Sequence, residues 1–243
     1  MKIDLNCDLG EEAGNDEAIM PYITSANIAC GFHAGNEDVM RATVKLARRH
    51  GVNIGAHPGW NDRQNFGRLE MNIPAEEAEE IVFQQINALA QIAKEEGLAL
   101  THVKPHGALY NQAAKDRTLA GAIVRAVKRI SVDLVLVGLA GSGLCEAGVE
   151  AWIRTAGEGF PDRAYNPDGT LMSRSKAGAL IESPEEVAAN ALRLIKEGIL
   201  FGEKVVQVDT LCLHGDHPQA AKNAKLLRGM LMKNGIEVVG LKK

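Results

Sequence analysis

The sequence predicts an α/β fold, and its simplest form is a single-domain β/α barrel that spans residues 1–243. Strand-like and helix-like segments alternate along the whole chain, which is typical of βα units around a parallel sheet. A length of 243 residues suits one barrel domain with a full core. In addition, polar side chains directly follow several predicted strands, as expected where strand ends meet at a barrel mouth.

Short runs of β-branched or apolar residues predict the strands. They lie near 2–8, 23–31, 52–57, 99–105, 133–138, 151–156, 205–213 and 236–241. Stretches of helical periodicity predict the helices between them, near 36–50, 74–96, 116–130, 184–199 and 218–234. The chain contains no Pro- or Ser-rich linker and no internal repeat, so we expect one domain.

Local signals mark several helix ends. Residues 183–186 read Ser-Pro-Glu-Glu, a capping box with the serine as N-cap and the proline in the first turn. Gly97, Gly198 and Gly235 each follow a helical run. Glycine at these positions suits the left-handed conformation that often ends a helix.

An open doubly wound sheet shows the same alternation, so the placement of polar residues has to separate the two folds. Asp8, His33, His57, His106 and Asp216 fall at or just after the ends of five different predicted strands. In a barrel, the carboxyl ends of all strands converge on one mouth, where catalytic groups collect. An open sheet instead places its site at a switch point between two strands. Contributions from five strands therefore favour the barrel.

Composition and charge exclude several kinds of partner. Apolar residues make up 46% of the chain and charged residues 24%, and the net charge is −4 without long runs of one sign. We therefore expect no nucleic-acid partner. No stretch approaches 18 apolar residues and no apolar leader follows Met1, so we expect no membrane partner and a cytoplasmic location. The four cysteines stand alone in the sequence, which predicts reduced thiols.

The stretch from Thr101 to Tyr110 contains the densest group of candidate catalytic residues. His102, Lys104 and His106 alternate along a predicted strand and therefore project to the same side. Two imidazoles and an ammonium group are costly to bury unless they are paired or functional. A strand with one solvent-facing polar edge is the alternative, although parallel strands flanked by helices are normally covered on both faces.

The first three predicted strands add a carboxylate and two imidazoles. Asn6 and Asp8 share one face of the first strand, and Asp8 lies at its end, where it is a candidate general base or ligand. His33 follows the second strand, in a turn that suits either a site or a neutral core histidine, and His57 ends the third. Asp8, His33 and His57 together could hold a metal. Their spacing matches no diagnostic motif, so metal binding stays open.

Later segments supply candidates for substrate binding. Arg163 and Arg174 are candidate anion clamps, since a guanidinium group can donate two parallel hydrogen bonds to a carboxylate or phosphate; a solvated surface turn explains them equally well. His214 and Asp216 end a further strand, and Asp216 also suits a helix N-cap. Residues 61–68 form a long βα loop, which favours a lid or binding loop. The sequence contains no P-loop motif, so the chain shows no clear ATP signature of its own.

Taken in order, these segments resemble the LamB/YcsF family of 5-oxoprolinase A subunits. The matching segments are Asp4–Glu11, Thr24–Gly35, Gly55–Gly59, His102–Asn111, Asp162–Tyr165 and His214–Asp216. The resemblance implies a β/α barrel of the glycoside hydrolase/deacetylase type with seven strands. It also implies a hydrolase that opens 5-oxo-L-proline to L-glutamate, coupled to ATP hydrolysis and acting with partner subunits B and C.

On this resemblance we expect subunits B and C to activate the lactam with ATP, and this chain to hydrolyse the activated intermediate. The catalytic candidates are Asp8, His33, His57, Lys104 and His106: Asp8 with a histidine activates water, while Lys104 and His106 stabilise developing charge. The substrate-binding candidates are Asn6, Asn27, His102, Tyr110, Glu158, Arg163, Arg174, His214 and Asp216. Two alternatives stay open, a metal-dependent deacetylase or carbohydrate hydrolase of the same fold and a non-catalytic subunit that only presents substrate.

Overall fold

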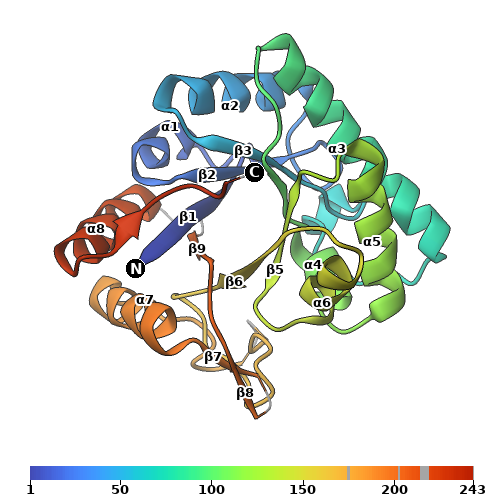
Figure 1. Ribbon diagram of the computed structural model, residues 1–243. Helices are drawn as coiled ribbons and strands as arrows, with labels where there is room; N and C mark the ends of the chain where they lie inside the picture. The colour runs from blue at the N-terminus through green and yellow to red at the C-terminus, as the bar shows by residue number, and fades with distance from the viewer. Residues whose placement is uncertain (174–175, 202, 214–218, 243) are drawn as a thin grey trace.

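The computed structural model describes residues 1–173, 176–201, 203–213 and 219–242. Within these residues, seven parallel strands form a closed barrel in the order β1-β2-β3-β4-β5-β6-β9, and β9 pairs back onto β1. The barrel strands are β1 (Lys2–Leu9), β2 (Ser25–Ala29), β3 (Asn53–His57), β4 (His102–Val103), β5 (Val135–Leu139), β6 (Thr155–Gly159) and β9 (Thr210–Leu213). The predicted seven-stranded β/α barrel is therefore confirmed (Figure 1).

Helices surround this barrel (Figure 1). They are α1 (Asp16–Ile19), α2 (Glu37–His50), α3 (Ala75–Glu95), α4 (Gly107–Ala113), α5 (Arg117–Ile130), α6 (Gly143–Glu150), α7 (Pro184–Glu197) and α8 (Ala220–Lys233), with short 3-10 turns η1 (Met20–Tyr22) and η2 (Arg63–Asn65). Apolar residues of the helices, such as Val44, Ile86 and Ile123, are fully buried in one core cluster with strand residues such as Leu5 and Ile28. The main core thus lies between the barrel wall and the helices, which leaves the barrel interior to other side chains.

Helix ends follow the local sequence signals. The hydroxyl of Ser183 accepts a hydrogen bond from the backbone N–H of Glu186 at the start of α7, at 3.4 Å. Gly97, Gly198 and Gly235 have φ angles of 74°, 76° and 73°, the left-handed region that glycine enters without steric cost. The serine cap and the three positive φ angles are therefore present, whereas the Ser183 hydroxyl donates to Glu185 and Gly198 has an extended ψ of −167°.

Some segments differ from the sequence prediction. The predicted strand at 151–156 is displaced, because exposed Trp152 has a φ of 60° in the turn before β6. The predicted strand at 205–213 is two strands: β8 (Lys204–Val206) forms an antiparallel hairpin with β7 (Ile199–Phe201), and only β9 joins the barrel. Helices α1, α4 and α6 were not predicted because they are only four, seven and eight residues long, too short for a clear periodicity.

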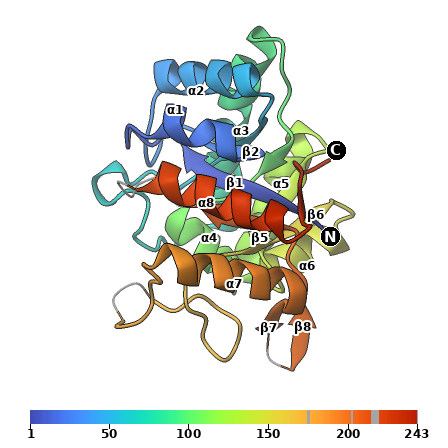
Figure 2. The ribbon, with the colours of Figure 1, turned by 90° about the vertical axis from the view of Figure 1, so that its left-hand side faces the viewer.

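The two ends of the barrel have different roles. Both chain termini lie on one side of the molecule (Figure 2), where the last strand β10 (Glu237–Val238) pairs in parallel with the beginning of β1. The loops that follow the strands lie at the other end. No helix of the described residues is long and apolar enough to cross a membrane.

Candidate active site

A cavity of about 390 Å³ opens at the carboxyl ends of the barrel strands. Asp8 from β1, His57 from β3, and Lys104 and His106 from the end of β4 line one part of its wall. Each of these side chains comes from the last residues of a strand or from the residues just after it. The structure therefore brings together polar groups that lie about a hundred residues apart in the sequence, as the barrel prediction requires.

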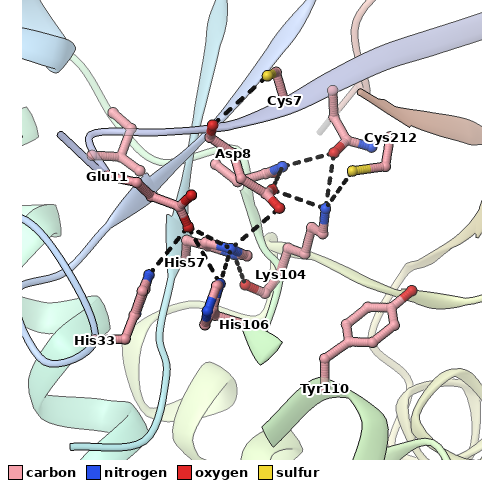
Figure 3. A network of polar contacts seen from close by, with 12 residues as sticks. Cys7, Asp8, Glu11, His33, His57, Lys104, His106, Tyr110 and Cys212 are labelled. Atoms are coloured by element: carbon pink, nitrogen blue, oxygen red, sulfur yellow. Dashed lines mark hydrogen bonds and ion pairs between the residues drawn. The ribbon is translucent and has the colours of Figure 1, made fainter. Parts of the chain in front are cut away.

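Lys104 lies at the centre of a buried polar network inside the barrel (Figure 3). Its Nζ donates to Asp8 Oδ1 at 2.9 Å and to Cys212 Sγ at 3.1 Å, and it lies 2.9 Å from Glu158 Oε1. Burial alone would lower the pKa of Lys104, but the two carboxylates outweigh burial and hold that pKa well above its ordinary value. Lys104 is therefore a fixed positive charge, suited to stabilising an anion rather than to accepting a proton.

Asn6, Asn27 and His102 hold this network in place. Asn27 Nδ2 donates to Asp8 Oδ1 at 2.8 Å and to Asn6 Oδ1 at 2.7 Å. The remaining Asn27 Oδ1 lies 2.7 Å from His102 Nε2, so this ring nitrogen carries the proton and donates. Burial lowers the pKa of His102 to about 3, which keeps the ring neutral. Among the described residues, these three lie beneath the cavity rather than on its wall, so they position other groups.

Glu158 and Tyr110 form a further part of the network. The Tyr110 hydroxyl donates to Glu158 Oε2 at 2.8 Å, and Asn6 Nδ2 donates to Glu158 Oε1 at 2.9 Å. Burial raises the pKa of Tyr110 well above its ordinary value, so the phenol stays protonated. Glu158 is completely buried while Tyr110 lines the cavity, so Tyr110 is the one of the pair that can meet a substrate.

Three histidines and Glu11 form a second cluster next to Asp8 (Figure 3). His33 Nε2, His57 Nε2 and His106 Nδ1 lie 3.4, 3.7 and 3.3 Å from Glu11 Oε1. The ring of His33 stacks on that of His106, with 3.8 Å between centroids. Burial lowers the pKa of His57 to about 3.

Glu11 was not predicted as a site residue. Gly10, with a φ of 70°, turns the chain after β1 so that Glu11 points over the barrel while the next residue, Glu12, pairs with Arg63 on the surface. The sequence grouped Asp8 with the histidines. In the structure Asp8 Oδ1 pairs with Lys104 and Asp8 Oδ2 lies 3.5 Å from His57 Nε2, while Glu11 is the carboxylate at the centre of the three histidines. The glycine before two glutamates was the available signal, but it does not say which glutamate turns inward.

The remaining predicted site residues lie in the later loops. Arg163 lines the cavity, and its Nη2 donates to the Met172 carbonyl at 2.6 Å. Arg174, His214 and Asp216 lie outside the described residues. The predicted loop at 61–68 contains η2 and contributes to the cavity wall, as expected of a binding loop. All four cysteines are free and buried, and burial raises the pKa of Cys212 well above its ordinary value, so this thiol is not a nucleophile.

Comparison with known proteins links this geometry to one family. The model of the LamB/YcsF family matches residues 3–243. The 5-oxoprolinase A subunit of Pyrococcus abyssi is 48% identical, with 100% of this chain and 98% of that protein covered. The protein of the same name from Shouchella clausii is 51% identical, with 97% of each covered. The crystal structure of a lactam utilization protein from Thermus thermophilus matches with a TM-score of 0.91 and 44% identity, covering 99% of this chain and 100% of that one.

Solved deacetylases share the architecture at much lower identity. The peptidoglycan deacetylase PdaC of Bacillus subtilis matches with a TM-score of 0.51 and 13% identity, covering 99% of this chain and 87% of that one. At this identity the likeness extends to the fold alone. It agrees with the deacetylase-like barrel that the family resemblance implied.

Proposed function

Since the chain belongs to the LamB/YcsF family, we propose that it is the A subunit of an ATP-dependent 5-oxoprolinase. The reaction opens the ring of 5-oxo-L-proline to L-glutamate and is coupled to ATP hydrolysis with partner subunits B and C. Relatives at about 48% identity over their full length carry this subunit name. A similar solved protein is described by its role in lactam utilization.

The observation that carries the proposal is the pairing of a carboxylate with a permanent ammonium group at one cavity wall. Asp8 and Lys104 both line the cavity, 2.9 Å apart, and Lys104 is almost completely buried. Hydrolysis of a lactam needs water activated near a carbonyl carbon and an anion stabilised next to it. Asp8 removes a proton from the attacking water, and Lys104 stabilises the negative charge of the phosphate carried by the former carbonyl oxygen.

We assign the ATP-dependent step to the partner subunits. Phosphorylation of the lactam oxygen makes the ring carbon more electrophilic and turns that oxygen into a leaving group. Water then adds at this carbon, the bond from carbon to nitrogen breaks, and the nitrogen takes up a proton, which gives an acyl phosphate of glutamate. A second water adds to the acyl phosphate and phosphate leaves, which gives glutamate. The missing P-loop motif in this chain supports ATP binding by a partner.

The cavity suits a small anionic substrate. A volume of about 390 Å³ is within the usual range for a small-molecule site. Arg163 lies on the wall and is the candidate partner for the substrate carboxylate, while Arg68 and Lys115 add positive charge nearby. Tyr110 supplies a neutral hydrogen-bonding group on the same wall. These cations favour a carboxylate or phosphorylated ligand over a neutral one.

Reconstitution with purified candidate B and C subunits tests the proposal. We expect 5-oxoproline and ATP to give glutamate, ADP and phosphate in equal amounts only when all three proteins are present. Mixtures that lack any one protein serve as controls. Full glutamate production by B and C without this chain would rule out the proposed role, and so would a complete complex that leaves 5-oxoproline unchanged.

A further inference from the structure

In the cluster of Glu11, His33, His57 and His106, two ring nitrogens present their lone pairs to each other. His57 Nδ1 lies 2.7 Å from the Lys104 carbonyl oxygen, and His106 Nε2 lies 2.8 Å from the Phe66 carbonyl oxygen. A carbonyl oxygen can only accept, so each of these outer ring nitrogens carries the proton. The inner nitrogens, His57 Nε2 and His106 Nδ1, are therefore both acceptors, yet they face each other at 3.0 Å.

The other two members of the cluster are also unsatisfied. Glu11 Oε1 is buried, and no hydrogen bond to it is found within the described part of the chain. The same holds for both ring nitrogens of His33, a side chain that is only 1% exposed. Buried polar atoms without partners are rare and usually indicate a bound water, ion or ligand. Glu11 Oε1, His57 Nε2 and His106 Nδ1 are acceptors around one centre, and a cation there would pair with all three.

The local charge favours such a cation. Three carboxylates lie here with one ammonium group: Asp8 and Glu158 pair with Lys104, while Glu11 lies among the histidines. The buried groups next to the cluster therefore carry an excess of negative charge.

We propose that Glu11, His33, His57 and His106 form a binding site for one divalent transition-metal ion, best matched by zinc. Imidazole and carboxylate ligands suit zinc and its first-row neighbours, whereas magnesium and calcium take oxygen ligands almost alone. Ligand atoms about 2.0–2.1 Å from a tetrahedral zinc ion lie about 3.3 Å from one another. Four of the six separations within the cluster are 3.0 to 3.7 Å, close to this spacing, and all six are within 4.8 Å.

The groups next to the four candidate ligands also support a metal site. The carbonyl groups of Lys104 and Phe66 fix the orientation and tautomer of two ligand rings, which is the usual second layer around metal-binding histidines. Glu11, His57 and His106 also line the cavity, so an ion at their centre is accessible to a small ligand. The site goes beyond the proposed 5-oxoprolinase role, because it can be occupied whether or not that reaction occurs.

Zinc titration of the full-length, chelator-treated chain tests this site without any activity assay. We expect the wild-type chain to bind one zinc ion, as measured by calorimetry and by elemental analysis after dialysis. Glu11→Gln removes the carboxylate at nearly constant shape and should weaken binding at least about tenfold. The neighbouring Glu12→Gln, whose side chain is half exposed and paired with Arg63, is the matched control and should bind like the wild type.

Two results would overturn the site: no stoichiometric zinc on the wild-type chain, or equal affinity in the Glu11→Gln and Glu12→Gln variants. Should Glu11→Gln fail to fold by circular dichroism, X-ray absorption of the zinc-loaded wild type decides the question alone. Imidazole scattering with zinc-to-nitrogen distances of about 2.0–2.1 Å is expected. A zinc shell without imidazole would contradict the assignment. Neither readout depends on glutamate formation, so failure here is distinct from failure of the proposed reaction.

Discussion

Lys104 shows what a single side chain does for both stability and chemistry in this barrel. Its ammonium group is only 2% exposed and is tolerated because Asp8 and Glu158 lie at hydrogen-bonding distance. The alternation His102, Lys104, His106 was sufficient to predict that these three residues share a face. Sequence spacing could not give their partners, since Glu158 lies more than fifty residues away and contacts Lys104 only because the barrel closes.

Replacement of Lys104 by Met should destabilise the protein. The carboxylate of Glu158 is fully buried and would be left without its cation, a situation that costs roughly 3–5 kcal/mol. Denaturant unfolding at pH 7 measures the loss. The double variant Lys104→Met/Glu158→Gln removes one stranded charge and should recover part of the stability. A Lys104→Met protein as stable as the wild type would show that the ammonium group is not needed to balance Glu158.

Protonation of His102 should make the stability of the metal-free protein depend on pH. Burial lowers the pKa of His102 from 6.5 to about 3. Between pH 6.5 and pH 3, the imidazole of His102 therefore takes up a proton in the unfolded chain but not in the folded one. The stability that neutral His102 contributes is fully present above pH 6.5. As the pH falls toward 3, the free energy of unfolding decreases by about 1.4 kcal/mol per pH unit. Urea unfolding between pH 7.5 and 4.5 should give a shallower decline for His102→Gln than for the wild type. Identical slopes would contradict a neutral buried His102.

At the scale of elements, the loop between β3 and α3 holds His33 and His106 in position. Gln85 on α3 accepts from the Gly59 N–H at 3.0 Å and donates to the Gly59 carbonyl at 2.9 Å, which fixes the loop against the ring of His33. The same loop supplies the Phe66 carbonyl that holds His106. The unusual length of this loop predicted a lid or binding loop, and Phe66 and Arg68 of the loop line the cavity. Its contacts could not be predicted, because they depend on packing between segments distant in sequence.

A methyl group at Gly59 should disturb the cluster through this contact. A Cβ atom at Gly59 would lie 2.6 Å from His33 Nδ1, and the two hydrogen bonds to Gln85 prevent the backbone from moving away. We expect Gly59→Ala to cost about 1–3 kcal/mol of stability and to weaken zinc binding. Gly229→Ala in α8, where a Cβ meets nothing within 4 Å, is the control and should leave zinc affinity unchanged. If Gly59→Ala bound zinc with wild-type affinity, this result would contradict the assignment of His33 as a zinc ligand.

At the scale of the whole molecule, closure of the barrel brings polar residues that are distant in the sequence together at one site. Alternating strands and helices, together with polar residues at strand ends, were enough to predict the barrel and to expect Asp8, His33, His57, Lys104 and His106 at one mouth. The hairpin of β7 and β8 and the inward turn of Glu11 were not predictable in this way. Both depend on local backbone geometry rather than on hydrophobic periodicity.

The proposed role of Asp8 as general base also depends on the closed barrel, because β1 and β4 bring Asp8 beside Lys104. Asp8→Asn keeps the shape of the side chain and an oxygen for Lys104 and Asn27, but the amide cannot take a proton from water. Folding should therefore be preserved, which circular dichroism and thermal unfolding can check.

The most direct measurement is the rate of ATP-coupled glutamate formation by the reconstituted three-subunit complex that carries Asp8→Asn. If Asp8 is the general base, the rate falls by about 10²-fold or more while the variant chain still folds and assembles. A folded, assembled Asp8→Asn complex that turns over 5-oxoproline at the wild-type rate would contradict the account and favour a subunit that only presents substrate.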